Sequence, residues 1–450
     1  MKWLALLAAL GGVIPIAAWL KGNRQHIPKF FILIGILPYL FKSVSGLDVG
    51  LISWNERSGI VSGLELTMVD ILAMVIYLSL PRSGQPVPFF AVFGLYFLAL
   101  CLSMFQAESL LAGSFYIWQT ARVFFLFLVV QQACADERVP AALLMGLAIG
   151  LFIQTAVVVW QRIGLGWIQA HGTFVHQNTL GMVAIMVLLP HFALLLGGSR
   201  RWAVWGASLA GALVAAMTTS RASVGLTAAG LALTYAITSM HTFTPRKAIV
   251  GFAGLILVAA LLPVVFQSFQ ARFAVSALSD DYGEREAFKR AAALILEDHP
   301  MGVGANHYVV TSKYRGYADR AGVYHSEESR NAHVHNAYWL TAAETGYLGF
   351  IAFVLLLLHP AIVAFRCGWR NADDPRGALL LGMGSALTVV YVHCNYEWIF
   401  VTVQLQYFFA ILVGMIAGLA QQLGYWATGP RWRVFAGPAA ALVKQKVNAN

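Results

Sequence analysis

The sequence has 450 residues, of which 59% are hydrophobic and only 11% are charged. Soluble domains carry about 25% charged residues, whereas the apolar runs of this chain repeatedly approach the roughly 20 residues that span a bilayer. The composition therefore excludes a soluble globular protein and predicts an all-α polytopic membrane protein. The net charge of +10 does not indicate nucleic-acid binding, because the basic residues are spread between apolar runs instead of gathering on one polar domain.

Apolar runs bounded by Pro, Gly or charge predict thirteen membrane spans. The runs are 3–20, 28–46, 64–80, 87–105, 112–133, 140–162, 179–197, 202–218, 222–240, 247–267, 337–365, 377–393 and 399–421. Twelve spans is the alternative, because 28–46 is broken by Pro38 and Lys42. The first run lacks a convincing small-residue cleavage site after it, so we expect a retained helix.

Four regions follow from these runs. We expect a transmembrane bundle at 1–268, a long polar loop at 269–336, C-terminal transmembrane helices at 337–421 and a tail at 422–450. Alternate loops differ in basic charge: one set, with the tail, carries sixteen Lys and Arg, and the other short loops carry five. Because basic loops stay in the cytoplasm during insertion, we expect the tail to be cytoplasmic and the loop 269–336 to face outward.

The polar stretch 280–350 holds seven of the thirty Lys and Arg and five of the twelve His. Residues 284–297 have helix-forming composition with apolar residues at helical spacing, which predicts an amphipathic helix whose apolar side faces acyl chains. The segment HPMGVG at 299–304 ends this helix in a tight turn. Residues 305–330 show no clear period, and we expect them to be mobile.

The predicted topology places several polar segments on one outer face. They are His171, His176, Arg221, the loop 269–336 and the connection 394–398. Because these segments come from five distant parts of the chain, their agreement indicates a composite site. The four cysteines are scattered without ligand spacing, so we expect neither a disulfide nor a zinc site.

His335 begins the segment that re-enters the membrane and is followed by Asn336. An imidazole takes up a proton near neutral pH, which suits a general base at a water-exposed surface. The alternative is an interfacial histidine in an aromatic belt. His333 lies two residues away and would point elsewhere on a helix.

Three arginines are candidates for binding phosphate. Arg221 lies in a short turn between two apolar runs, where a planar guanidinium needs an anionic partner. Arg285 and Arg290 are five residues apart and diverge by about 140° on a helix, so one of them, with Arg285 preferred, binds a diphosphate while the other faces solvent. Lipid headgroups and a solvated basic face are the alternatives.

Other polar groups extend the candidate site. The segment HGTFVHQN at 171–178 offers His176 and Asn178 for sugar or phosphate, with a plain turn capped by Asn178 as the alternative. Arg122 lies inside an apolar run, where an unpaired charge is expensive, and either pairs with Asp70 or binds a lipid phosphate.

Taken in order, these segments resemble the O-antigen ligase and polymerase family of bacterial envelopes. The resemblance covers roughly 165–365 and rests on GTFVHQN at 172–178, TSRA at 219–222, ER at 284–285, HPMGVG at 299–304, HN at 335–336 and ETGYLG at 344–349. It implies an inverting, metal-independent glycosyltransferase in the bacterial inner membrane, with His335, Arg221 and Arg285 as catalytic residues. Arg290, His176, Asn178, Asn336 and Arg122 are then candidates for substrate binding.

The resemblance also implies the substrates. The donor is a glycan on undecaprenyl diphosphate, and the acceptor is the lipid A core in a ligase or another lipid-linked glycan in a polymerase. An exopolysaccharide polymerase or a protein O-oligosaccharyltransferase is an alternative within the family. A transporter of an anionic solute, with Arg122 and Arg221 as binding groups, is the alternative from another class, although transport sites usually lie at the membrane midplane between internal repeats.

Overall fold

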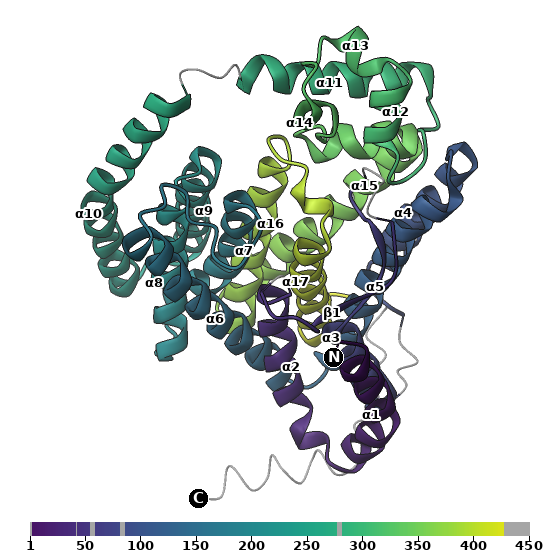
Figure 1. The fold of residues 1–450 in the computed structure, drawn as a ribbon. Coiled ribbons are helices and arrows are strands. Elements are labelled where there is room, and N and C mark those ends of the chain that lie inside the picture. Colours follow the sequence, from purple (N-terminus) through teal and green to yellow (C-terminus); the bar gives the residue numbers. More distant parts are fainter. Residues whose placement is uncertain (1, 42, 55–58, 82–85, 277–280, 427–450) are drawn as a thin grey trace, which may run out of the picture.

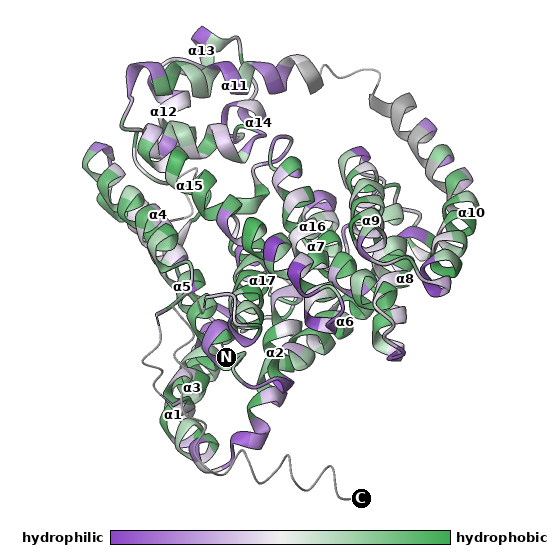
Figure 2. Cartoon of the chain, turned by 180° about the vertical axis from the view of Figure 1, so that it is seen from behind, coloured by the Kyte–Doolittle hydropathy of each residue, from purple (hydrophilic) through white to green (hydrophobic). Residues whose placement is uncertain are grey.

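The computed structural model describes residues 2–41, 43–54, 59–81, 86–276 and 281–426. The fold is mostly helical, which confirms the predicted class of all-α polytopic membrane protein (Figures 1 and 2). Within these ranges, eight helices are long and apolar enough to cross a bilayer. They are α1 (Lys2–Gly22), α5 (Leu110–Ala133), α6 (Arg138–Val159, continued as a π-helix to Gly164), α7 (Gln177–Leu196), α9 (Arg221–His241), α15 (Ala337–Arg370), α16 (Pro375–His393) and α17 (Val403–Gln422).

The other apolar runs form five helices. Four of them have 10 to 16 residues and are shorter than the full spans that we expected: α2 (Ile27–Ile36), α3 (Met68–Ser79), α4 (Phe90–Ser103) and α8 (Trp202–Met217). The fifth, α10 (Pro245–Ser276), contains the whole predicted run 247–267. A helix of 12 residues, such as α3, covers about 18 Å of a hydrocarbon core roughly 30 Å thick. Conversely, α10 continues to Ser276, past the predicted boundary at 268. Lys42 and the tail beyond 426 lie outside the described residues.

A β-hairpin interrupts the helical order near the N-terminus. Its strands β1 (Asp48–Ser53) and β2 (Gly63–Thr67) are antiparallel, with Asp48 opposite Thr67. The predicted span 64–80 is therefore wrong at its start, because Thr67 is the N-cap of α3 and ends the strand. The Thr67 side chain accepts a hydrogen bond from the backbone of Asp70, whose carboxylate accepts from the backbone N–H of Thr67.

A buried ion pair joins three helices of the bundle. Arg122 on α5 donates to the Asp70 carboxylate on α3 at 2.8 Å, as one of the two sequence-based alternatives predicted. It also donates to the hydroxyl of Tyr407 on α17 at 3.0 Å, and that hydroxyl donates to Asp70 at 2.6 Å. Each charge therefore has a partner of opposite charge and a shared hydroxyl, which is the arrangement that makes a charge tolerable inside a membrane.

Replacing Arg122 alone with methionine is expected to lower the unfolding free energy by about 3 to 5 kcal/mol, because it leaves the Asp70 carboxylate buried without a counter-charge. The double variant Arg122→Met with Asp70→Asn is expected to lose less, since it removes both charges and the side-chain oxygen of Asn can still accept from the backbone N–H of Thr67. Thermal unfolding of the purified variants in detergent measures both losses. A single variant that unfolds like the wild type would contradict this role of the ion pair.

The polar loop folds as a helical cap over one end of the bundle. It contains α11 (Asp281–Asp298), α12 (Tyr308–Tyr314), α13 (Tyr317–Ala321) and α14 (Glu327–Arg330), which gather beside the start of α15 (Figure 1). The amphipathic helix predicted at 284–297 is thus confirmed. The expectation that its apolar side faces acyl chains is wrong. Ala287, Phe288 and Ile295 are buried within the protein core, where α11 packs against α13 and α15.

Residues 305–330 are more regular than their sequence suggested. Three short helices form there, and side chains fix them to other parts of the chain. Asn306 donates to the carbonyls of Val61 and Ala112, and the Arg315 guanidinium pairs with the Glu108 carboxylate at 2.8 Å. These long-range contacts replace the apolar periodicity on which the expectation of mobility depended.

The turn at 299–304 fastens the cap to α15 and so positions α11. Val303 and Gly304 donate their backbone N–H groups to the carbonyls of Ala343 and Glu344, at 3.1 and 2.9 Å. Gly302 has a positive φ of 82°, and a Cβ there would collide with the Glu344 carbonyl. The turn therefore requires glycine at this position, both for its conformation and for its close approach to α15.

Candidate functional site

The connection between α16 and α17 places a buried carboxylate at the end of the bundle beneath the cap. The Glu397 side chain is only 4% exposed. It contacts Arg285 Nη2 at 3.7 Å and His335 Nδ1 at 3.5 Å, and it accepts a hydrogen bond from Asn178 Nδ2. We call Asn178, Arg285, His335 and Glu397 the Glu397 cluster. Its members come from α7, α11, the segment before α15 and the α16–α17 connection.

The start of α15 holds His335 in place. Asn336 is the N-cap of this helix and accepts hydrogen bonds from the backbone N–H groups of Tyr338 and Trp339, at 2.9 and 3.0 Å. Its own amide donates to the Asn395 carbonyl at 3.0 Å. Asn336 thus caps α15 and is hydrogen-bonded to the 394–398 connection, which fixes the backbone beside His335. In this way Asn336 positions the imidazole next to Glu397.

Helix α11 brings Arg285 to the same carboxylate. Arg285 Nη1 donates to the Tyr396 carbonyl at 3.2 Å, while Nη2 faces Glu397. About a third of the Arg285 side chain, 35%, remains exposed. A guanidinium has five N–H donors in a planar fork, so Arg285 retains donors for an anionic ligand in addition to these two contacts.

Glu397 is held in its ionised form. Burial by itself raises the pKa of this carboxyl. The contact with His335, its charge, and the charges of Arg285 and His176 lower the pKa more, so it lies below the ordinary value of 4.5. At neutral pH the cluster therefore contains a carboxylate that attracts and orients the cationic groups around it.

The start of α7 supplies Asn178, and the alternative in which Asn178 itself caps this helix is wrong. His176, and not Asn178, is the N-cap: its Nδ1 accepts from the backbone N–H of Asn178 at 3.2 Å. Gly172 has a positive φ of 63° in the preceding turn, a conformation that favours glycine. With the cap made by His176, the Asn178 amide is directed to Glu397.

Arg221 begins α9 at the same end of the bundle. Ser220 caps this helix by accepting from the backbone N–H of Ser223 at 3.3 Å. The first turns of α9 and α7 touch closely, because a Cβ on Gly181 would collide with Ser223 Oγ. Arg221 therefore lies close to the first turn of α7, which carries Asn178. The contacts with Glu397 described above are made by Asn178, Arg285 and His335.

Two predicted site residues are not brought to the Glu397 cluster. Arg122 lies in the ion pair with Asp70 inside the bundle. Arg290 diverges from Arg285, as their spacing predicted, and donates twice to the Ala321 carbonyl at the end of α13, at 3.2 and 3.0 Å. Both guanidinium groups are thus used by contacts within the protein.

The His333 ring stacks on Trp398, with ring centroids 4.3 Å apart, whereas the His335 ring lies beside Phe288, with centroids 6.0 Å apart. Burial, with a smaller contribution from the charge of His335, lowers the pKa of His333 to about 4. His333 is therefore neutral at physiological pH. Its stacking fixes the indole of Trp398 beside Glu397 and does not place an imidazole within reach of a ligand.

This low pKa predicts a pH-dependent stability. The unfolded chain binds a proton at His333 near pH 6.5, whereas the folded chain does so only near pH 4, so stability is full above pH 6.5 and decreases as the pH falls toward 4. The loss at pH 5 is expected to be about 2 kcal/mol. His333→Phe keeps the stacking and should unfold with a smaller difference between pH 7 and pH 5. Equal differences in the variant and the wild type would contradict the assignment.

Glu397 is the member that sequence reasoning missed. The sequence offered one indication of it: Glu397 is the acidic residue of the short connection 394–398, on the face where histidines and arginines were expected to gather. In the structure this carboxylate orients an imidazole and a guanidinium beside each other, which can serve proton transfer and anion binding at one place. Within the part of the chain that the structure describes, no three His, Cys, Asp or Glu side chains are grouped for a metal ion.

Comparison with known families gives a match over part of the chain. Residues 207–354 match the family described as O-antigen ligase. The matched segment begins within α8 and ends within α15, so it contains Arg221, Arg285 and His335, while Asn178 and Glu397 lie outside it. A comparison with curated proteins finds no match.

Proposed function

We propose, on the premise that this chain belongs to the O-antigen ligase and polymerase family, that it transfers a glycan from undecaprenyl diphosphate to an acceptor hydroxyl at the periplasmic face of the inner membrane. The observation that carries the proposal is the meeting of Arg285 and His335 at the buried Glu397. An arginine that binds a leaving diphosphate and a histidine that takes up the acceptor proton are the two groups that this transfer needs.

Arg285 and Arg221 bind the diphosphate of the donor. A planar guanidinium matches phosphate oxygens, and both residues lie at the capped end of the bundle, where a polyprenol chain can remain in the membrane. As the bond between the anomeric carbon and the diphosphate breaks, negative charge grows on the leaving oxygen. The arginines stabilise that charge and so lower the barrier to departure.

His335 acts as the general base. Its Nδ1 faces Glu397, which leaves Nε2 to accept the proton of the acceptor hydroxyl. The hydroxyl oxygen attacks the anomeric carbon from the side opposite the diphosphate, the proton passes to Nε2, and undecaprenyl diphosphate leaves with the bonding electrons. One displacement of this kind inverts the anomeric configuration. Glu397 positions the ring and stabilises the imidazolium that forms.

Ligation to the lipid A core is the reaction we propose, with polymerisation as the alternative inside the family. Deleting the gene and resolving the lipid-linked glycans and lipopolysaccharide on a gel distinguishes them. Chains of normal length that stay on undecaprenyl diphosphate support a ligase, whereas single repeats support a polymerase. Unchanged lipopolysaccharide with glycosylation lost from a protein would support the oligosaccharyltransferase alternative, and unchanged glycans throughout would contradict the proposal.

Transport of an anionic solute receives less support. That alternative used Arg122 and Arg221 as the binding groups, but Arg122 is bonded to Asp70 and Tyr407 in the buried ion pair. The polar groups of the Glu397 cluster gather at one end of the bundle, away from the midplane where transporters bind their substrates.

A further inference from the structure

A second polar site lies at the end of the bundle opposite the Glu397 cluster. There a cavity of about 600 Å³ is enclosed by helix ends: the starts of α6, α8 and α16 and the ends of α7 and α17. The Glu397 cluster uses the other ends of α7, α16 and α17. Because each helix runs the length of the bundle, the two sites lie at opposite membrane surfaces.

The cavity is apolar inside and charged at its edge. Leu144, Met145, Leu379 and Leu419 contribute apolar wall, and His191 is buried with its ring nitrogens 2.7 and 3.2 Å from the backbone carbonyls of Val187 and Leu144. This volume is in the range of small-molecule sites, and an apolar wall with a few charged groups at the edge is their usual composition. A ligand that fits it has an apolar part and a polar head.

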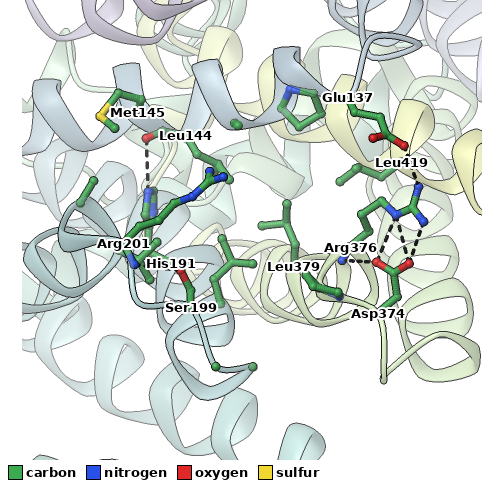
Figure 3. A pocket seen from close by; sticks show the side chains of 18 of the residues that line it. Glu137, Leu144, Met145, His191, Ser199, Arg201, Asp374, Arg376, Leu379 and Leu419 are labelled. Atoms are coloured by element: carbon green, nitrogen blue, oxygen red, sulfur yellow. Dashed lines mark hydrogen bonds and ion pairs between the residues drawn. The ribbon is translucent and has the colours of Figure 1, made fainter. Parts of the chain in front are cut away.

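The edge of the cavity carries two arginines and two carboxylates, and both carboxylates pair with the same arginine. Figure 3 shows Arg376 on one side, bonded to Asp374 and facing Glu137, with N to O distances of 2.7 and 3.5 Å for its ion pairs with them. Arg201 lies on the other side, with its guanidinium directed toward the cavity beside Leu144. Among the residues that the structure describes, no carboxylate pairs with Arg201.

Two exposed tryptophans indicate where the cavity lies relative to the membrane surface. Trp202 and Trp205, in the first turn of α8 beside Arg201, are both exposed on the outside of the bundle. Tryptophans gather where the hydrocarbon meets the headgroups. The edge of the cavity with Arg201 and Ser199 therefore lies at the level of the lipid phosphates, and the apolar wall lies beneath it.

We propose that this cavity binds an anionic phospholipid, with the phosphate at Arg201 and the Ser199 hydroxyl and the upper part of an acyl chain against Leu144, Leu379 and Leu419. Basic pockets between transmembrane helices recognise acidic lipid headgroups by the same combination of charge and apolar contact. The assignment depends on the geometry of this end of the bundle alone and stands whether or not the glycosyltransferase proposal is correct.

Native mass spectrometry of the whole protein tests the site. The purified protein is exchanged into detergent with equal amounts of phosphatidylglycerol and phosphatidylethanolamine, and the retained lipid is measured by mass. We expect retention of phosphatidylglycerol in the wild type, reduced about tenfold by Arg201→Ala, because a charge-assisted hydrogen bond contributes enough for a tenfold change. Ala141→Trp, which fills the cavity without changing its charge, is expected to reduce retention as well.

Arg200→Ala is the matched control. Arg200 is the neighbouring arginine, exposed and outside the cavity lining, so its variant should retain phosphatidylglycerol like the wild type. Equal loss from Arg200→Ala and Arg201→Ala would show attraction by basic charge alone and would overturn the site. Equal retention of both lipids, undiminished retention in Arg201→Ala, or binding of free phosphate in place of lipid would overturn it too. Unfolding temperatures confirm that each variant is folded.

Discussion

Replacing His335 with alanine is expected to lower the rate of glycan transfer by a factor of about 10² to 10⁴, the contribution of a positioned general base. The donor should still bind, because the arginines that we assign to the diphosphate are unchanged. The fall should therefore appear in kcat and leave the KM for the donor nearly constant. Transfer by the purified protein from a lipid-linked donor to its acceptor measures both constants.

His325→Ala is the matched control for this variant. His325 lies in the same cap, and its side chain is 85% exposed and far less enclosed than that of His335. We expect nearly normal transfer after this change. A His335→Ala protein that is folded and transfers glycan at the wild-type rate would exclude His335 as the base.

Replacing Arg285 with alanine is expected to lower the transfer rate by a factor of about 10² to 10³, the usual effect of removing one donor to a developing negative charge. The factor by which kcat falls should exceed the factor by which the KM for the donor rises, because the charge on the leaving diphosphate is greatest in the transition state. The variant also removes a positive neighbour of Glu397. The same transfer assay, with the KM for the donor determined separately, measures this loss.

Lys289→Ala and Arg285→Lys are the comparisons for that result. Lys289 lies one turn along α11 and pairs with Glu286 at the surface, at 2.7 Å, so its loss should change transfer little. Arg285→Lys keeps the charge but loses the planar fork, and it should recover only part of the rate. Full activity in Arg285→Ala would remove this residue from the mechanism.

The sequence predicted which segments meet at one end of the bundle. Counting basic residues in alternate loops put Arg221, the loop that holds Arg285 and His335, and the connection 394–398 on one face, and the structure brings them to one end of the bundle. Position along a membrane helix determines which end a residue occupies, so a topology is sufficient for this inference.

Glu397 could not be identified in the same way. A single carboxylate between two apolar helices has no local pattern, and its importance comes only from the side chains that other segments bring to it. For the same reason sequence spacing could show that Arg285 and Arg290 diverge but could not show where each one points. The carbonyl of Ala321, from a different helix, determines the direction of Arg290.

Hydrophobicity was also insufficient to predict what each apolar surface contacts. The apolar side of α11 was expected to face acyl chains, but Phe288 and Ile295 pack inside the protein. An amphipathic pattern shows that a helix has an apolar side and does not specify whether lipid or protein covers it. The hairpin was missed because Thr67 ends a strand and begins a helix within one apolar run.

A structure of the protein with its lipid diphosphate donor bound tests the central claim most directly. The account predicts that the diphosphate lies within hydrogen-bonding distance of Arg285 and Arg221, with the anomeric carbon on the side of His335 Nε2. A diphosphate bound elsewhere, with the Glu397 cluster separated from the sugar, would contradict it.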